Sequence, residues 1–197
     1  MIAVLGPEGT SSHELALALF GEGEVILLPT IRRIFDEVEK GRYDGLVPVE
    51  NSEAGGVGPT LDCLQTHQVF ITGESYMEVH HHCAAFEELE GLTLIYAHPQ
   101  THEQCSEFLE GLSVEVIHTS SNAASAQAMK EREHAGAIVS ELAARIYGIP
   151  ILRRDVQNTP GNTTRFILIS SRPPAESNPE KCSILIDPQE DRPGLLH

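Results

Sequence analysis

The sequence lacks the segments that mark membrane-spanning, secreted and disulfide-rich proteins. No window approaches the roughly 18 consecutive apolar residues that a membrane span needs. Residues 1–5 have no basic region and end at Gly6 and Pro7, so we expect no secretory signal and a cytoplasmic location. None of the four cysteines forms a C-x-x-C pair, which predicts reduced and mostly buried thiols at Cys63, Cys83, Cys105 and Cys182.

Positive charge is also scarce. The 197 residues include 13 lysines and arginines against 29 aspartates and glutamates, which gives a formal net charge of −16. A field of this sign repels phosphate backbones and anionic membranes, so we expect neither nucleic acid nor a membrane as a partner. If the substrate is itself an anion, local features must attract it against the global charge.

Motifs for nucleotides, serine nucleophiles and metals are missing as well. The sequence has no G-x-G-x-x-G, no G-x-x-x-x-G-K-[ST] and no G-x-S-x-G. His80, His81 and His82 lie on a predicted strand, where neighbouring side chains point to opposite faces and cannot converge on one ion. His98 and His102 are four residues apart, but no H-E-x-x-H motif accompanies them. We therefore expect no metal and no cofactor.

What the sequence does contain is a regular alternation of short apolar runs and segments with helical periodicity. One series begins with a predicted strand at 2–5, and a second begins with a strand at 92–95 after predicted strands at 69–72 and 78–85. This order predicts an α/β protein with mostly parallel sheets, arranged as two lobes with a cleft between them. We expect a first lobe of residues 1–74 and 157–172, a second lobe of residues 75–156, and a linker of residues 173–181.

Hydroxyl and amide side chains gather where predicted strands pass into helices. Helix starts present unpaired N–H groups and the positive end of the helix dipole, and can bind carboxylates without any net positive charge. A serine or threonine at a single junction is more simply an N-cap. Several such junctions in an acidic chain favour a small-anion site, and they occur at 9–12, 99–101, 119–121 and 139–140.

Six segments, in this order, resemble the motifs of the prephenate dehydratase family: GPEGTSS (6–12), VPVENS (47–52), HPQ (98–100), TSS (119–121), SELAA (140–144) and NTTRF (162–166). The resemblance covers residues 1–170 and implies two lobes like those of type II periplasmic binding proteins, with the active site in the cleft. Residues 182–197 resemble the start of the ACT domain that follows the catalytic part in this family and binds phenylalanine.

The resemblance also implies a reaction and its residues. A carbon–oxygen lyase of this family converts prephenate to phenylpyruvate, CO2 and water without a metal or organic cofactor. Thr164 would lie beside the leaving hydroxyl, and Arg165 and Phe166 would complete its motif. Ala97 departs from the family, where serine is common at this position. The implied substrate contacts are Thr10, Ser11, Asn51, Ser52, Gln104, Thr119, Ser120 and Ser121.

Two other interpretations stay open. Arogenate dehydratase shares these motifs and accepts an amino group on the substrate side chain. A non-catalytic module that binds a small carboxylate has the same fold, although the motif at 164–166 argues against it. We further expect a homo-oligomer, either a dimer or a tetramer, and inhibition by phenylalanine only where the ACT domain is complete.

Overall fold

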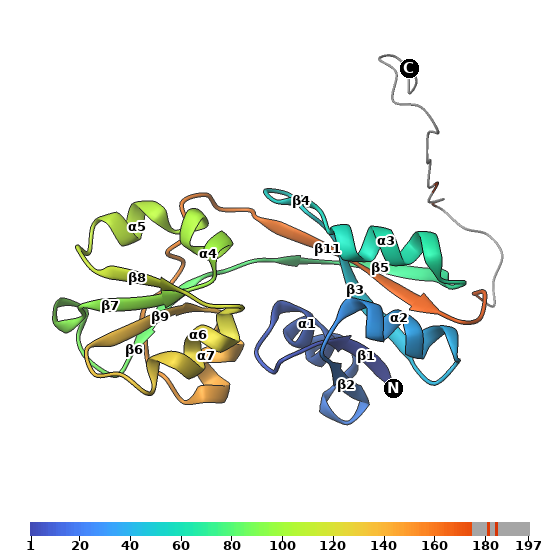
Figure 1. The fold of residues 1–197 in the computed structure, drawn as a ribbon, viewed down its shortest axis with the longest axis horizontal. Coiled ribbons are helices and arrows are strands. Elements are labelled where there is room, and N and C mark those ends of the chain that lie inside the picture. The colour runs from blue at the N-terminus through green and yellow to red at the C-terminus, as the bar shows by residue number, and fades with distance from the viewer. Residues whose placement is uncertain (175–180, 182–183, 185–197) are drawn as a thin grey trace, which may run out of the picture.

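The computed structural model describes residues 1–174, 181 and 184. Two β-sheets with helices packed against them form two lobes, and two long strands of the first sheet extend toward the second (Figure 1). Among the described residues, no helix has the length and hydropathy needed to cross a bilayer.

The first lobe is built on a six-stranded sheet with the order β2-β1-β3-β11-β5, in which β4 pairs with β3. β1 and its two neighbours are parallel, whereas β11 runs antiparallel to both β3 and β5. The strands are β1 (Ile2–Leu5), β2 (Val25–Leu28), β3 (Asp44–Asn51), β4 (Gly55–Gly56), β5 (Phe70–Glu78) and β11 (Thr163–Ser170). The helical elements are α1 (Ser11–Phe20), η1 (Glu22–Glu24), α2 (Ile31–Glu39) and α3 (Gly58–Thr66).

Alternation along the strands gives this sheet two apolar faces. Phe166 of β11 packs with Leu15 of α1 on one face, while Ile167 packs with Phe35 of α2 on the other. Gly45 of β3 lies close under α2, because a Cβ atom there would approach Ile34 Cγ2 to 2.8 Å. The helices thus cover both faces and leave the strand ends to form the edge of the lobe.

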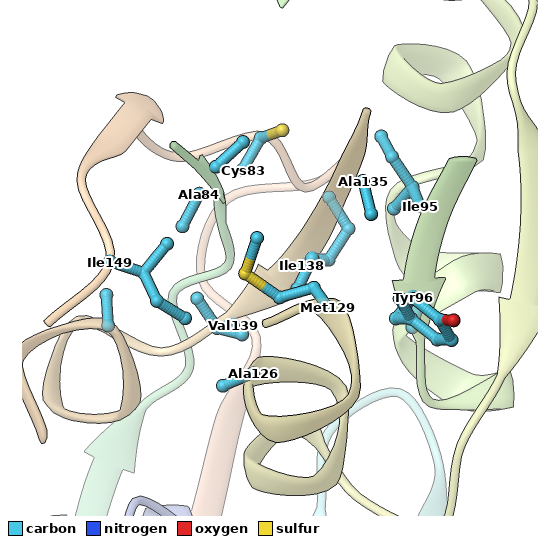
Figure 2. Packing of buried hydrophobic residues seen from close by; sticks show 14 of the residues in the cluster. Cys83, Ala84, Ile95, Tyr96, Ala126, Met129, Ala135, Ile138, Val139 and Ile149 are labelled. Carbon is cyan, nitrogen blue, oxygen red and sulfur yellow. The ribbon is translucent and has the colours of Figure 1, made fainter. Parts of the chain in front are cut away.

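The second lobe is built on a five-stranded sheet with the order β10-β6-β9-β7-β8. Its core is rich in alanine, and Figure 2 shows Met129 and Ala126 of α6 beside the strand that carries Ile138 and Val139. The strands are β6 (His82–Ala85), β7 (Leu94–Ala97), β8 (Glu115–His118), β9 (Ala135–Val139) and β10 (Ile151–Arg153). The helical elements are η2 (Leu89–Gly91), α4 (Pro99–Gln104), α5 (Ser106–Glu110), α6 (Asn122–Met129) and α7 (Glu141–Tyr147).

Two chain segments join the lobes, one between β5 and β6 and the other between β10 and β11. They bind each other through Val79 N and Asn162 O at 2.7 Å, and through Val156 N and His81 O at 2.8 Å. The lobes also touch directly, since Ser140 Oγ donates to Gly9 O at 3.2 Å. These contacts form the base and one wall of the region between the lobes.

The expected α/β class is confirmed, and the strand order with two crossing segments agrees with the type II periplasmic-binding-protein-like architecture. The expectation of mostly parallel sheets is wrong, because both sheets are mixed: β11 is antiparallel to β3 and β5, β4 to β3, and β6 to β9 and β10. Two neighbouring strands differ from the prediction. The strand expected at 78–85 begins only at His82, and β5 pairs with β11 as far as Glu78, so residues 75–78 lie in the first sheet and cross the boundary expected at residue 74. Gly73 and the charged Glu74 interrupt the apolar run, and pairing with β11 extends β5 through them. The expected ACT-like segment and most of the expected linker lie outside the described residues.

Candidate active site

A cluster of hydrogen-bonded polar side chains lies where β3 ends and β11 begins. Asn51 and Thr164 are register partners on these antiparallel strands, so their side chains share the face that α1 covers. Asn51 Nδ2 donates to Thr164 Oγ1 at 2.9 Å and to Asn162 Oδ1 at 2.7 Å. Asn51 and Thr164 are each only 9% exposed, so the cluster is a buried and interlocked unit.

The backbone around this cluster is fixed by the same side chains. Asn51 Oδ1 accepts from the N–H groups of Glu53 and Ala54 at 3.0 and 2.9 Å, which turns the chain after β3. Ser52 Oγ accepts from Thr163 N at 2.9 Å, while Ser52 N donates to Thr163 O at 2.9 Å. Thr164 Oγ1 accepts a hydrogen bond, and its own proton has no acceptor among the described residues. The cluster therefore presents one oriented hydroxyl donor.

Arg165 and Phe166, the other two predicted catalytic residues, do not join this cluster. Arg165 points to the opposite face of the sheet, where its Nη2 lies 2.8 Å from Glu74 Oε2. Phe166 is 1% exposed and packs in the core with Val4 and Leu46. Of the three, only Thr164 presents a polar group to the cluster.

Two of the five predicted substrate-contact hydroxyls at helix starts, those of Thr10 and Ser121, accept from the backbone of their own helix. Thr10 caps α1, since its Oγ1 accepts from His13 N at 3.3 Å, and it also donates to Leu5 O at 2.8 Å. Ser121 caps α6 by accepting from Ala124 N at 3.0 Å. Thr119 Oγ1 lies 2.6 Å from Ser125 Oγ. Ser120 is exposed, and Ser11 lines a cavity between the lobes.

Two cavities lie between the lobes. The histidine cavity, of about 260 Å³, is lined by Ser11, Glu14, Met77, Glu78, Val79, His80, His81, His82, Asn122, Ser140, Glu141, Arg154 and Asp155. The amide cavity, of about 270 Å³, is lined by Glu53, Ala54, Gln100, Glu103, Gln104, Asn158 and Thr159. Both volumes lie near the lower end of the roughly 300–1,000 Å³ typical of ligand sites, a size that suits a small metabolite.

The polar cluster lies next to both cavities, although the residues that line them are its neighbours and not the cluster itself. Met77 of the histidine cavity is the register partner of Thr164 on β5, so the two side chains share a face. Glu53 and Ala54 of the amide cavity donate to Asn51. Gln104 and His81 lie between the cavities, with Gln104 Oε1 2.9 Å from His81 Nε2. The structure therefore brings Asn51, Ser52, Thr164 and Gln104 to the region between the lobes.

The histidine cavity carries no excess of positive charge. Burial lowers the pKa of His81 and of His82, so both rings are neutral at pH 7. Burial, and next the nearby Glu141 carboxylate, raise the pKa of Glu14. Arg154 is paired with Glu141 at 3.0 Å. An anionic substrate must therefore be bound by neutral N–H and O–H donors rather than by unpaired cations.

The three consecutive histidines do not share the predicted strand, since only His82 lies in β6 and His80 and His81 lie in the segment between β5 and β6. His80 Nδ1 lies 2.8 Å from Asp155 Oδ1, and Asp155 N donates to His82 Nδ1 at 3.1 Å. His81 points to the other side and binds Gln104. His98 accepts from Gln100 N at 3.3 Å as the cap of α4, whereas His102 pairs with His118. Among the residues that the structure describes, no group of three or more potential ligands is arranged to hold a metal ion.

Three further residues belong to this region and were not among the predicted site residues. Asn162 joins Asn51 and Ser52, and its place two residues before Thr164 was the available signal. Asn158 holds α4 in place, since its N–H donates to Gln104 O at 2.7 Å and its Nδ2 donates to Glu103 O at 3.1 Å. His81 was considered only as a metal ligand, and no sequence pattern pointed to its contact with Gln104.

The fold and the site together define a two-lobed α/β protein with a polar cluster at the edge of one sheet, facing cavities between the lobes. The chain belongs to the prephenate dehydratase family, whose model, described as "PDT: Prephenate dehydratase", matches residues 2–174. The resemblance found in the motifs is thereby confirmed.

Curated relatives include enzymes named for prephenate and for arogenate. The bifunctional chorismate mutase/prephenate dehydratase of Stutzerimonas stutzeri is 38% identical over 203 residues, covering 100% of this chain and 55% of the relative. The arogenate dehydratase 2 of Petunia hybrida is 31% identical over 202 residues, covering 99% of this chain and 51% of the relative. The chain thus spans about half the length of these relatives.

Solved structures show the same fold. The prephenate dehydratase of Arthrobacter aurescens in complex with L-Phe matches with a TM-score of 0.78 and 29% identity, covering 92% of this chain and 62% of that one. A structure described as GqqA, a novel type of quorum quenching acylases, matches with a TM-score of 0.78 and 29% identity, covering 87% of this chain and 64% of that one. The same fold therefore carries two differently named activities.

Proposed function

We propose that this chain converts prephenate to phenylpyruvate, CO2 and water. The observation that carries the proposal is the oriented Thr164 hydroxyl, held by Asn51 at the sheet edge within the family motif. In the reaction the ring–carboxylate bond breaks and CO2 leaves, while its electron pair enters the ring. The ring–hydroxyl bond breaks on the opposite carbon, and one proton converts the departing hydroxide to water.

Thr164 assists departure of the hydroxyl in this proposal. Asn51 Nδ2 occupies a lone pair of Thr164 Oγ1, which leaves the threonine proton for the substrate oxygen. A hydrogen bond to an oxygen that gains negative charge is stronger in the transition state than in the ground state, so it lowers the barrier. Arg165 and Phe166 support this residue from the opposite face and from the core.

Neutral donors bind the two carboxylates of prephenate. Gln104 borders the amide cavity, Ser11 borders the histidine cavity, and Ser52 lies beside Asn162. Thr10, Thr119 and Ser121 contribute by holding helix starts in place, whereas Ser120 is exposed at the start of α6. Such donors attract an anion locally while the chain as a whole carries a net charge of −16.

The second candidate substrate is arogenate, and the Petunia relative favours it. Prephenate and arogenate should be assayed side by side, with ultraviolet absorbance reporting phenylpyruvate and chromatography reporting phenylalanine. We expect turnover of prephenate without an added metal. Turnover of arogenate but not of prephenate would make arogenate the substrate of this chain. Binding of either compound without turnover would favour a non-catalytic binding module. Hydrolysis of an acyl amide, tested in parallel, would instead favour the activity named for GqqA.

Three further expectations belong to this proposal. The lobes follow the expected division into residues 1–74 with 157–172 and residues 75–156, except that residues 75–78 pair in the first sheet, and an ACT-like segment begins near residue 182 and is joined to them by the linker. Phenylalanine inhibits only where that ACT domain is complete, in a homo-oligomer that is a dimer or a tetramer. Buried, reduced thiols at Cys63, Cys83 and Cys105 support a cytoplasmic location.

A further inference from the structure

His81 makes a contact that the proposed chemistry does not use. Its side chain is 3% exposed, and its Nε2 lies 2.9 Å from Gln104 Oε1 across the region between the lobes. His81 Nδ1 is buried and has no hydrogen-bond partner among the described residues. One ring nitrogen is thus bound to a candidate substrate contact, and the other is not bound at all.

This arrangement determines which ring nitrogen carries the proton. A buried N–H without an acceptor is rarer and more costly than a buried lone pair without a donor. The proton therefore belongs on Nε2, where Gln104 Oε1 accepts it. Burial keeps the ring neutral, and a single tautomer follows.

The tautomer of His81 in turn determines the orientation of the Gln104 side-chain amide. An amide has one oxygen acceptor and one NH2 donor, and either end can face a given direction until a partner selects one. With Oε1 turned to His81, the NH2 group of Gln104 is left for the amide cavity, where an anionic oxygen needs a donor. The reverse orientation would present an oxygen to the substrate carboxylate and repel it.

We propose that His81 is a positioning residue, which donates from Nε2 to Gln104 Oε1 and thereby aims the Gln104 NH2 group at a carboxylate or carbonyl oxygen of the substrate. The identity of the substrate in this inference rests on the proposed function. The positioning role does not depend on the hinge backbone, because His81 N donates to Gln157 and His81 O accepts from Val156 whatever the side chain is.

Two substitutions of similar size separate this role from a structural one. The amide nitrogen of glutamine superimposes on histidine Nε2, so His81→Gln keeps the donor, whereas that of asparagine superimposes on Nδ1, so His81→Asn loses it. We expect His81→Asn to raise KM for prephenate roughly tenfold, as loss of a hydrogen bond that orients a charged contact does. His81→Gln should stay within about threefold of the wild type. Both variants should keep the melting temperature within a few degrees.

A double-mutant cycle tests whether His81 acts through Gln104. If it does, adding His81→Asn to Gln104→Leu leaves KM at the value of Gln104→Leu alone. The proposal would be overturned if the double variant raised KM by the product of the two single effects. It would also be overturned if His81→Asn and His81→Gln had equal KM values.

A measurement without substrate distinguishes failure of this inference from failure of the proposed function. Nitrogen-15 NMR of histidine-labelled protein should show His81 with the proton on Nε2, and His81 Nδ1–H would reject the positioning role even in an active enzyme. A wild type that turns over neither prephenate nor arogenate would reject the proposed function, while the His81 tautomer would still decide the orientation of Gln104.

Discussion

The sheet edge of the first lobe and the helix starts of the second lobe use the same kinds of polar residue in different ways. In the first lobe, Asn51 and Thr164 bind each other across two strands, so their side chains are held by other side chains. In the second lobe, Ser121 and Ser140 are N-caps whose oxygens bind the backbone of their own helices. Both kinds of hydroxyl accept a hydrogen bond and keep their own proton, but a capping hydroxyl stabilises its helix, whereas Asn51 orients the Thr164 hydroxyl from a neighbouring strand. The type of residue alone does not distinguish these two uses.

The largest expected effect separates two residues on one face of β11. Phe166→Ala should lower the free energy of unfolding by roughly 3–5 kcal/mol, because it removes a fully buried ring from the core beneath α1. Denaturant unfolding measures this loss, and Phe166→Leu should lose much less. If Phe166→Ala had unchanged stability and a reduced kcat, Phe166 would be a residue of the active site rather than of the core.

Thr164→Val, two residues away, should change activity rather than stability. We expect kcat for prephenate to fall by roughly 10²-fold or more, because the hydroxyl is lost at nearly constant volume. Steady-state kinetics measure this effect, with Thr164→Ser as the matched control that keeps the hydroxyl. An unchanged kcat of Thr164→Val would show that the Thr164 hydroxyl does not assist the reaction.

Two neighbouring serines provide a similar comparison in the second lobe. Ser121→Ala should destabilise the chain by roughly 1 kcal/mol, because Ala124 N loses its cap. Ser120→Ala should leave the unfolding transition in place and raise KM more than it lowers kcat, because a ground-state carboxylate contact contributes to binding. If Ser121→Ala alone raised KM, the cap would also be a substrate contact.

The smallest expected effect is a pH-dependent one at Glu14. Burial, and next the Glu141 carboxylate, raise the pKa of Glu14 in the folded chain, so stability from this group is present at low pH and is lost as pH rises through the raised pKa. Glu14→Gln should therefore raise the melting temperature at pH 7 by about 1–3 °C and give no gain at pH 4. Thermal unfolding of both proteins at the two pH values measures this difference. A lower melting temperature of Glu14→Gln at pH 7 would contradict the prediction.

Much of the fold could be predicted because apolar periodicity and glycine or proline stops reflect local physics. The order of strands and helices follows from such runs, whereas the length of β5 does not, since its polar stretch is held by pairing with β11. The cluster depends on contacts between residues such as Asn51 and Thr164, which are 113 positions apart, and no local pattern contains them. Arg165 was expected among the catalytic residues, although strand alternation alone places it on the face opposite Thr164, because neighbours on a strand face opposite sides.

The position of β11 in the first sheet bears on how the chain folds during synthesis. This strand is the last of the eleven described strands, yet it lies between β3 and β5. All strands of the second sheet lie between His82 and Arg153, so that lobe is complete on an emerging chain while the first sheet still lacks an interior strand. Until Thr163–Ser170 has left the ribosome, β3 and β5 each expose an unpaired edge. Thr164, which is proposed to assist the reaction, lies on the strand that completes the first sheet. A chain that stops before β11 therefore lacks both the complete sheet and the Thr164 hydroxyl.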